Sequence, residues 1–188
     1  REGRAKDGFD RTDPALLKML ALAWRDEIER FDEVLEKINL VPVSISYELD
    51  PCDRDKAREL TLLQRDGEYA KAAGEDLNSI VRGLLGFKGR MHLHFSAPIK
   101  DVVADADELA RLVDRAIVAG LKVFPTQAAA AQELGFTEIP DAGSWPVKVQ
   151  QAFAERLESC PQDYRPALLA SYGNLIRNRN ELGVSADS

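Results

Sequence analysis

Two short segments of this 188-residue chain alternate polar and apolar side chains, and they constrain its fold more than any other feature. A period of two is typical of a β-strand, because successive side chains of a strand point to opposite faces. The first segment spans residues 40–47 and the second spans residues 90–96. The segments between and after them repeat their apolar residues at helical spacing. The pattern predicts a mixed α/β fold with few strands and many helices.

Each predicted strand has one apolar side and one polar side. In the first strand the apolar side carries Val41, Val43, Ile45 and Tyr47. In the second it carries Met91, Leu93 and Phe95, and the polar side carries Arg90, His92 and His94. Pro42 has no N–H to donate, which is typical of the start of a strand, an edge or an irregular turn.

Helical spacing predicts the remaining elements. Asp13 and Pro14 are expected to begin a helix as N-cap and first helical residue, and its apolar spacing continues to Ile38. Further helices are predicted over residues 53–66, 75–85, 105–119, 126–134, 146–158 and 164–178. Only helices are expected beyond residue 100, so we predict a first part over residues 1–100 and a helical carboxy-terminal segment over residues 101–188.

Charge and apolar content exclude several classes of protein. The chain has 25 Lys and Arg residues against 32 Asp and Glu residues, a net charge of −7. This balance opposes the broad basic surface of a nucleic-acid binder, although a small pocket for one phosphorylated metabolite needs only two or three cations. No apolar run approaches the roughly 20 residues that span a bilayer. Cys52 and Cys160 are expected to be reduced thiols.

The first twelve residues form a polar loop with two glycines. Glu2, Arg4 and Lys6 crowd charges around Gly3, and such a loop can point cations and backbone N–H groups at a phosphate. A solvated charged loop is the alternative that the residues alone leave open. Because the chain starts with Arg1 inside this loop, we expect it to be cut from a longer protein.

Three motifs follow one another in an order that resembles the glycerol-3-phosphate and lysophosphatidate acyltransferase superfamily. The E-G-basic loop leads into T-D-P-A-L-L-K-M-L, then the strand V-P-V-S-I-S-Y-E, then K-G-R-M-H-L-H-F-S-A-P-I. The hydrophobic–Pro–hydrophobic strand that ends in Tyr47 and Glu48 is similar to the fourth conserved block of the glycerol-3-phosphate acyltransferase branch. The resemblance covers about the first hundred residues.

The resemblance implies a fold and an activity. It implies that the chain is the carboxy-terminal part of an acyltransferase-like mixed α/β sheet with covering helices, followed by a helical segment. Such enzymes transfer a fatty acyl group from acyl-CoA or acyl carrier protein to a hydroxyl of glycerol phosphate or lysophosphatidate, without a cofactor. Because the products are lipids, the expected location is the cytoplasm, with peripheral contact at the cytoplasmic face of a membrane.

The resemblance also implies roles for five residues. Glu2 and Gly3 fall on the third block, which helps bind the phosphorylated acceptor. The family arginine falls on an alanine here, so the phosphate cations are expected to be Arg4 and Lys6. Pro42 falls on the fourth block, which shapes the wall of the site.

The catalytic base of the family is expected to lie outside this chain. That base is the histidine of an H-x-x-x-x-D block, which precedes the third block, and it acts with the aspartate as base and orienter. The two histidines of this chain are followed five positions later by Ala97 and Ile99. No catalytic residue is therefore assigned, and the chain alone is expected to be inactive.

Other interpretations stay open. His92 and His94 have metal-ligand spacing, but a zinc site needs a third and usually a fourth ligand, which favours an ordinary strand face over a metal site. The chain as a whole is alternatively a helix-rich interaction module. A third interpretation is an acidic regulatory domain that binds a phosphorylated metabolite without chemistry.

Overall fold

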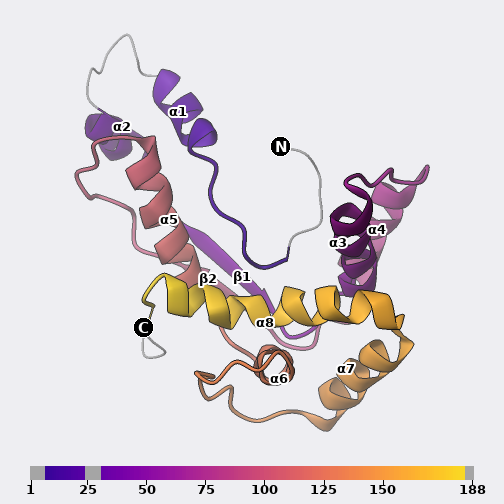
Figure 1. The fold of residues 1–188 in the computed structure, drawn as a ribbon. Coiled ribbons are helices and arrows are strands. Elements are labelled where there is room, and N and C mark those ends of the chain that lie inside the picture. The colour runs from indigo at the N-terminus through magenta and orange to yellow at the C-terminus, as the bar shows by residue number, and fades with distance from the viewer. Residues whose placement is uncertain (1–6, 24–30, 185–188) are drawn as a thin grey trace.

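The computed structural model describes residues 7–23 and 31–184, and it has the mixed α/β architecture that the sequence predicts (Figure 1). Two strands lie among the helices of the described residues. In chain order the elements are α1 (Pro14–Leu22), α2 (Phe31–Ile38), β1 (Val43–Tyr47), α3 (Asp53–Asp66), α4 (Glu75–Leu85), β2 (Met91–Phe95), α5 (Ala106–Gly120), α6 (Pro125–Glu133), α7 (Val147–Ser159), a 3₁₀ turn (Gln162–Tyr164) and α8 (Arg165–Glu181).

Strands β1 and β2 form an antiparallel two-stranded sheet. Val43 lies opposite Phe95, and Tyr47 lies opposite Met91. The backbone ladder continues past the strand ends, because the N–H of Ser96 donates to the Pro42 carbonyl at 3.0 Å. Helices α3 and α4 connect the two strands along the chain, so the hairpin is closed by a helical excursion instead of a tight turn.

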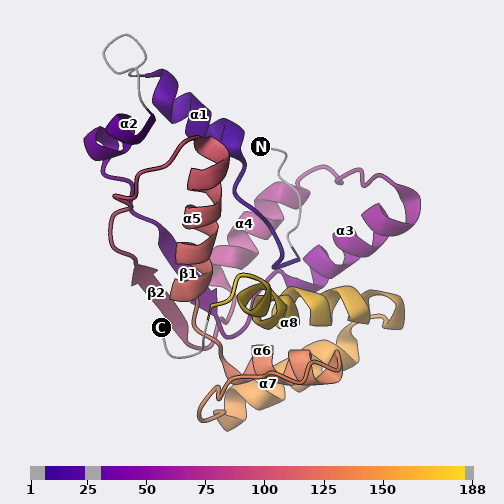
Figure 2. The same ribbon diagram turned by 60° about the vertical axis from the view of Figure 1, so that its left-hand side comes forward.

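Helix α8 runs across the molecule and holds its parts together (Figures 1 and 2). It contacts α3, α5 and α6, while α5 packs against both β1 and α1. Helices α6 and α7 lie on the side of α8 away from the sheet, and α3 and α4 stand at one end of it (Figure 1). The helices packed around α8 therefore form the centre of the fold, and the two-stranded sheet lies beside them.

Two clusters of buried apolar side chains form the core, and each joins residues from both sides of position 100. The first lies around α8 and consists of Leu49, Ala57, Ala130, Val149, Phe153, Cys160, Leu168, Leu169 and Tyr172. The second lies between α1, α2 and α5 and consists of Leu17, Leu35, Ile99, Val103, Ala106, Leu109, Ala110 and Val113. Burial of this kind stabilises a fold by roughly 25 cal/mol for each Å² of apolar surface removed from water.

Helix starts follow the capping rules at two places. The side chain of Asp13 accepts a hydrogen bond from the Ala15 N–H at 2.9 Å, with Pro14 in the first turn, as predicted. Asp105 caps α5 in the same way, accepting from the Glu108 N–H at 2.8 Å. At α3 no side chain caps the start: Asp53 is the first helical residue, and its carboxylate accepts from the Arg156 guanidinium in a buried ion pair.

Candidate functional site

One of the five predicted site residues lies in the part of the chain that the structure describes. Glu2, Gly3, Arg4 and Lys6 lie outside the described residues. Pro42 is buried just before β1, and its carbonyl closes the ladder with Ser96 at 3.0 Å. This position agrees with its predicted place at the start of a strand, and its role in a site wall stays a prediction.

The apolar sides of both strands share one face of the sheet, and that face is uncovered. Side chains on the two strands lie in cross-strand pairs, which is the arrangement that stabilises a sheet face. The pairs are Val43 with Phe95, Ile45 with Leu93, and Tyr47 with Met91. Their exposed fractions run from 36% for Tyr47 to 65% for Phe95. A contiguous apolar face of this kind marks a surface that binds another protein element.

The polar side of β1 is buried, whereas on β2 the same side is half-buried at His92 and exposed at His94. Ser44 donates from its hydroxyl to the Ile117 carbonyl at 2.6 Å, and the N–H of Lys122 donates to the Ser46 hydroxyl at 2.8 Å. Both serines are almost fully buried under the end of α5. The hydroxyls satisfy backbone groups that α5 leaves unpaired at its carboxy-terminal end, so a polar strand face is the one that suits this helix end.

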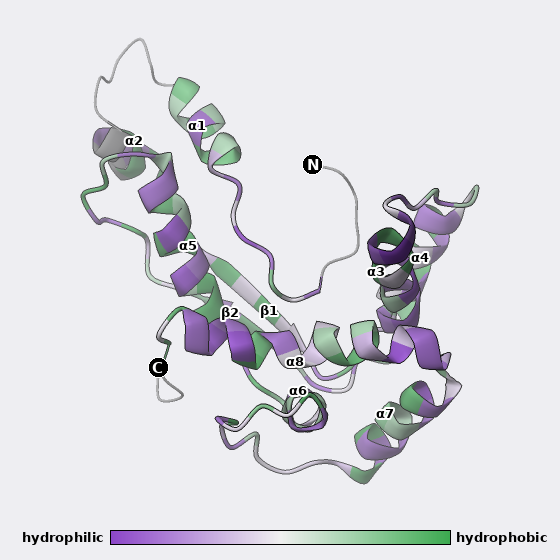
Figure 3. Ribbon diagram, viewed as in Figure 1, coloured by the Kyte–Doolittle hydropathy of each residue, from purple (hydrophilic) through white to green (hydrophobic). Residues whose placement is uncertain are grey.

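Helix α4 extends the apolar surface beyond the sheet. None of its residues is buried. Its exposed apolar side chains are Leu77, Ile80, Val81, Leu84 and Leu85. Tyr47 and Ile80 line one cavity of about 360 Å³, so the sheet face and α4 meet there. Figure 3 shows hydrophobic and hydrophilic residues side by side along α3 and α4. We call these α4 side chains and the six strand side chains together the uncovered apolar surface.

An ion pair between a buried carboxylate and an exposed guanidinium lies at the end of β1. The Glu48 carboxylate is fully buried and accepts from the Arg90 backbone N–H at 2.7 Å and from its guanidinium at 2.5 Å. This hydrogen bonding raises the pKa of the Arg90 guanidinium. Gly89 has a φ of +65°, and a Cβ there would lie 2.7 Å from a Glu48 carboxylate oxygen, so only glycine fits beside the pair. The Thr126 hydroxyl bonds the Glu48 carbonyl at 2.5 Å.

A second buried network ties α3, α7 and α8 together. The Asp53 carboxylate accepts from the Arg156 guanidinium at 2.7 Å and from the Tyr172 hydroxyl at 2.8 Å. The same hydroxyl accepts from the Asp50 N–H at 2.9 Å. Burial, with Asp53 close by, raises the pKa of Tyr172 well above its ordinary value. The hydroxyl therefore keeps its proton at neutral pH, and the network holds the fold in place instead of moving protons.

The cysteines offer no activated nucleophile. Both Cys52 and Cys160 are buried and unpaired. Burial, with Asp50 as the next cause, raises the pKa of the Cys52 thiol, and burial likewise raises that of Cys160. A thiol is a weak nucleophile in its protonated form, so both act as small core residues.

In the described ranges, 7–23 and 31–184, no group of three or more His, Cys, Asp or Glu side chains is placed to hold a metal ion. None of their helices combines the length and the apolar character that crossing a bilayer demands. The feature with the clearest capacity to bind is the uncovered apolar surface.

No protein-family model, curated protein or solved structure matches the chain. Sequence patterns alone located the apolar sides of both strands, but nothing in them indicated which side α5 covers. The pattern of α4 likewise indicated an apolar stripe without indicating that it is left uncovered. The resemblance to glycerol-phosphate acyltransferases therefore enters only as a proposal.

Proposed function

We propose that this chain is the acceptor-binding side of an acyltransferase that moves a fatty acyl group from a thioester to a hydroxyl of glycerol phosphate. The donor is acyl-CoA or acyl carrier protein, and the acceptor is glycerol phosphate or lysophosphatidate. In this proposal Arg4 and Lys6 hold the phosphate, Glu2 and Gly3 order the loop, and Pro42 shapes the wall beside it. No cofactor is required, because the acyl thioester carries the activated group.

The uncovered apolar surface carries the proposal. The two strands that hold the acyltransferase-like motifs pair with one another, and their common apolar face is exposed. The sheet is antiparallel, and an antiparallel sheet commonly leaves one face to water, but that face is then polar. Here the face left to water is the apolar one, which suits a sheet that another part of a larger domain covers. The part that supplies the catalytic base would cover this surface in the complete enzyme. The chain alone is then expected to bind without turning over substrate.

The deciding experiment combines sequencing of the upstream coding DNA with an acyl-transfer assay. The coding DNA upstream of Arg1 is read, and the protein it encodes is expressed together with this chain as one polypeptide. We expect an H-x-x-x-x-D block ahead of Arg1, transfer of an acyl group to glycerol 3-phosphate by the longer protein, and no thioester cleavage by this chain alone. An upstream sequence without that block, or turnover by this purified chain, overturns the proposal.

Charge reversal tests the acceptor site within the longer protein. We expect Arg4→Glu and Lys6→Glu to raise the KM for glycerol 3-phosphate at least tenfold, because a cation on the phosphate is replaced by a repelling carboxylate. Arg111→Glu is the matched control, since Arg111 is exposed on α5. Equal KM values for all three variants would remove Arg4 and Lys6 from the site.

A helix-rich interaction module is the second candidate, and the same apolar surface favours it. A module of this kind binds a protein partner through the surface and has no affinity for glycerol phosphates. The two candidates differ in whether the longer protein binds glycerol 3-phosphate. Saturable binding of this acceptor supports the enzyme. The absence of binding, together with the absence of the H-x-x-x-x-D block, supports the module.

A further inference from the structure

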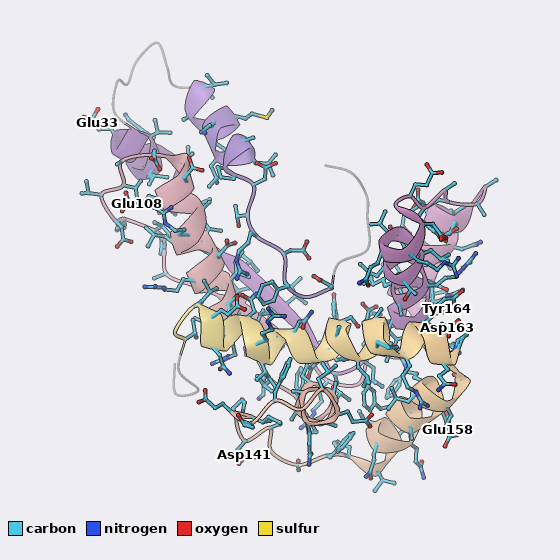
Figure 4. The ribbon with its side chains drawn as sticks, viewed as in Figure 1. Glu33, Glu108, Asp141, Glu158, Asp163 and Tyr164 are labelled. Carbon is cyan, nitrogen blue, oxygen red and sulfur yellow. The ribbon has the colours of Figure 1, made fainter. Side chains whose placement is uncertain are left out.

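A cavity of about 370 Å³ lies on the polar side of the sheet, away from the uncovered apolar surface. Ionisable side chains reach it from four places: His92 and His94 on β2, Lys122 after α5, Asp141 in the loop after α6, and Arg179 on α8. Figure 4 shows Asp141 on that loop. The proposed acyl transfer uses none of these residues.

The two histidines form one wall of the cavity. Their rings are stacked with centroids 6.3 Å apart and an angle of 23° between the planes. Residues two apart on a strand point to the same side, so both rings face the cavity together. Gly120 at the end of α5 lies so close that a Cβ there would collide with the His94 ring. The absence of a side chain at this position lets the helix end close the wall.

Two cations complete the cavity, and they differ in freedom. Arg179 is only 6% exposed, and its guanidinium donates to the Leu121 carbonyl at 2.8 Å, which holds it in place. Burial lowers the pKa of this guanidinium, but an arginine still keeps its charge in a protein. Lys122 is exposed, with its ammonium 5.9 Å from the centre of the Phe124 ring. One cation is thus held in place by a hydrogen bond, and the other is exposed.

The lining of the cavity includes one carboxylate, Asp141, one of whose oxygens accepts from the Gly143 N–H at 2.9 Å. The carboxy-terminal end of α5 adds about half a negative charge from its backbone carbonyls. Each imidazole that takes up a proton adds one positive charge to the lining. Histidine is the side chain that changes charge between about pH 5 and 8.

We propose that this cavity binds a tetrahedral oxyanion, in the protein's own setting the phosphate group of a phosphate monoester, and binds it more tightly when the two histidines are protonated. A guanidinium and an ammonium with two imidazolium N–H donors approach from three elements, which suits four oxygens arranged around one centre. The proposal is independent of the acyl transfer, because it uses neither the amino-terminal loop nor an acyl donor.

The NMR signals of His92 and His94 provide the readout of the test. They are the only two in the sequence, so the imidazole proton signals of an NMR spectrum come from this cavity alone. Sulfate is the probe, because it stays a dianion across the range in which histidine titrates. Sodium sulfate is added at constant ionic strength against sodium chloride, at about pH 6 and about pH 8. We expect saturable shifts of both signals with sulfate only, and an affinity at least threefold higher at the lower pH.

Two variants separate the cavity from general charge effects. Lys122→Gln is expected to weaken sulfate binding at least threefold, while Lys148→Gln, on α7 outside the cavity, leaves it unchanged. His94→Asn is expected to reduce the dependence on pH, read from the remaining His92 signal. The proposal is overturned by equal shifts in chloride and sulfate, by equal affinities of the two lysine variants, or by an unchanged pH dependence in folded His94→Asn.

A second titration identifies the source of the phosphate. Glycerol 3-phosphate represents a free monoester, and vesicles of phosphatidate represent a lipid headgroup. Shifts with glycerol 3-phosphate that saturate at lower concentration than with sulfate support a free ester, whereas an effect of the vesicles alone supports a lipid. Binding of sulfate with neither of these overturns the assignment to phosphate monoesters.

Discussion

Helices α4 and α8 differ in how well the apolar pattern of their sequences matches the burial of their side chains. Helix α4 has a well-defined apolar stripe, and none of its residues is buried. Helix α8 has no single apolar stripe, yet eight of its residues are buried, among them the polar Asn174, Asn178 and Arg179. A clear stripe shows which side of a helix requires a cover, but whether a cover is present depends on the other elements.

The position of each helix explains the difference. Helix α8 passes between α3, α5 and α6, so side chains on several of its sides meet neighbours, and its polar groups find partners there. Asn178, for example, accepts a hydrogen bond from Arg11 at 2.6 Å. Helix α4 stands at the rim, and the ion pair between its Arg82 and Asp55 joins it to α3. Stability should therefore reside in α8 and binding in α4.

The largest expected effect comes from the core of α8. Leu168→Ala removes a fully buried side chain and leaves a cavity, so we expect it to lower the free energy of unfolding by about 4 kcal/mol. Leu84→Ala on α4 is the matched control, because Leu84 is 73% exposed and its loss should cost less than about 0.5 kcal/mol. Urea unfolding measures both. Equal losses would show that α4 is packed as tightly as α8.

The buried ion pair behind α8 comes second. Asp53→Ala leaves the Arg156 guanidinium without its carboxylate and Tyr172 without an acceptor, and we expect a loss of about 3 kcal/mol in urea unfolding. Asp66→Ala breaks an ion pair with Arg65 on the surface and should leave the urea midpoint unchanged. A small effect of Asp53→Ala would mean that water or another group replaces the carboxylate.

Alkaline pH should lower the free energy of unfolding, because Tyr172 on α8 loses its proton. Its pKa is raised in the folded state, so the folded protein holds this proton more tightly than the unfolded chain does. The stabilisation is complete below the unfolded pKa of about 10 and is lost as the pH rises above it, by about 1.4 kcal/mol per pH unit. We expect Tyr172→Phe to have a shallower decline between about pH 10 and 11. The same slope in both proteins would exclude Tyr172 as the cause.

The smallest expected effect is the difference in stability between substitutions on the two sides of the sheet. Ser44→Ala removes the buried hydrogen bond to the Ile117 carbonyl and should cost about 1 kcal/mol. Ile45→Ser, on the next residue of β1, removes a larger apolar side chain from the uncovered face and should cost less than Ser44→Ala. Urea unfolding ranks the two variants. The reverse ranking would show that the apolar face is covered in solution, for instance by a second copy of the chain.

Much of the element order was predictable from local chemistry. The ranges 53–66 and 75–85 appear as α3 and α4 with the predicted bounds, and α5 and α7 are displaced by one residue at each end. The flanking glycines explain the success at α3 and α4, because Gly67 ends α3 and Gly74 precedes α4, each with a φ of +80°. The apolar spacing that was expected to continue to Ile38 appears as two helices, α1 and α2, within the described residues.

The sites were less predictable, because their parts come from distant segments. The cavity joins His92 to Arg179, and no local pattern links residues so far apart. The partner of Asp53 is Arg156, more than a hundred residues away, so no local rule indicated this ion pair. The predicted phosphate loop, from Glu2 to Lys6, lies outside the described residues and stays a prediction.

By itself, the sequence determined the order of most helices and strands, since periodicity acts within a few residues. It also determined that β1 and β2 each have one apolar and one polar side. Only the tertiary structure decided that the polar side of β1 is buried and that the apolar sides of both strands are exposed. The physical reason is that the end of α5 presents unpaired backbone groups, and the hydroxyls of Ser44 and Ser46 satisfy them where apolar side chains could not.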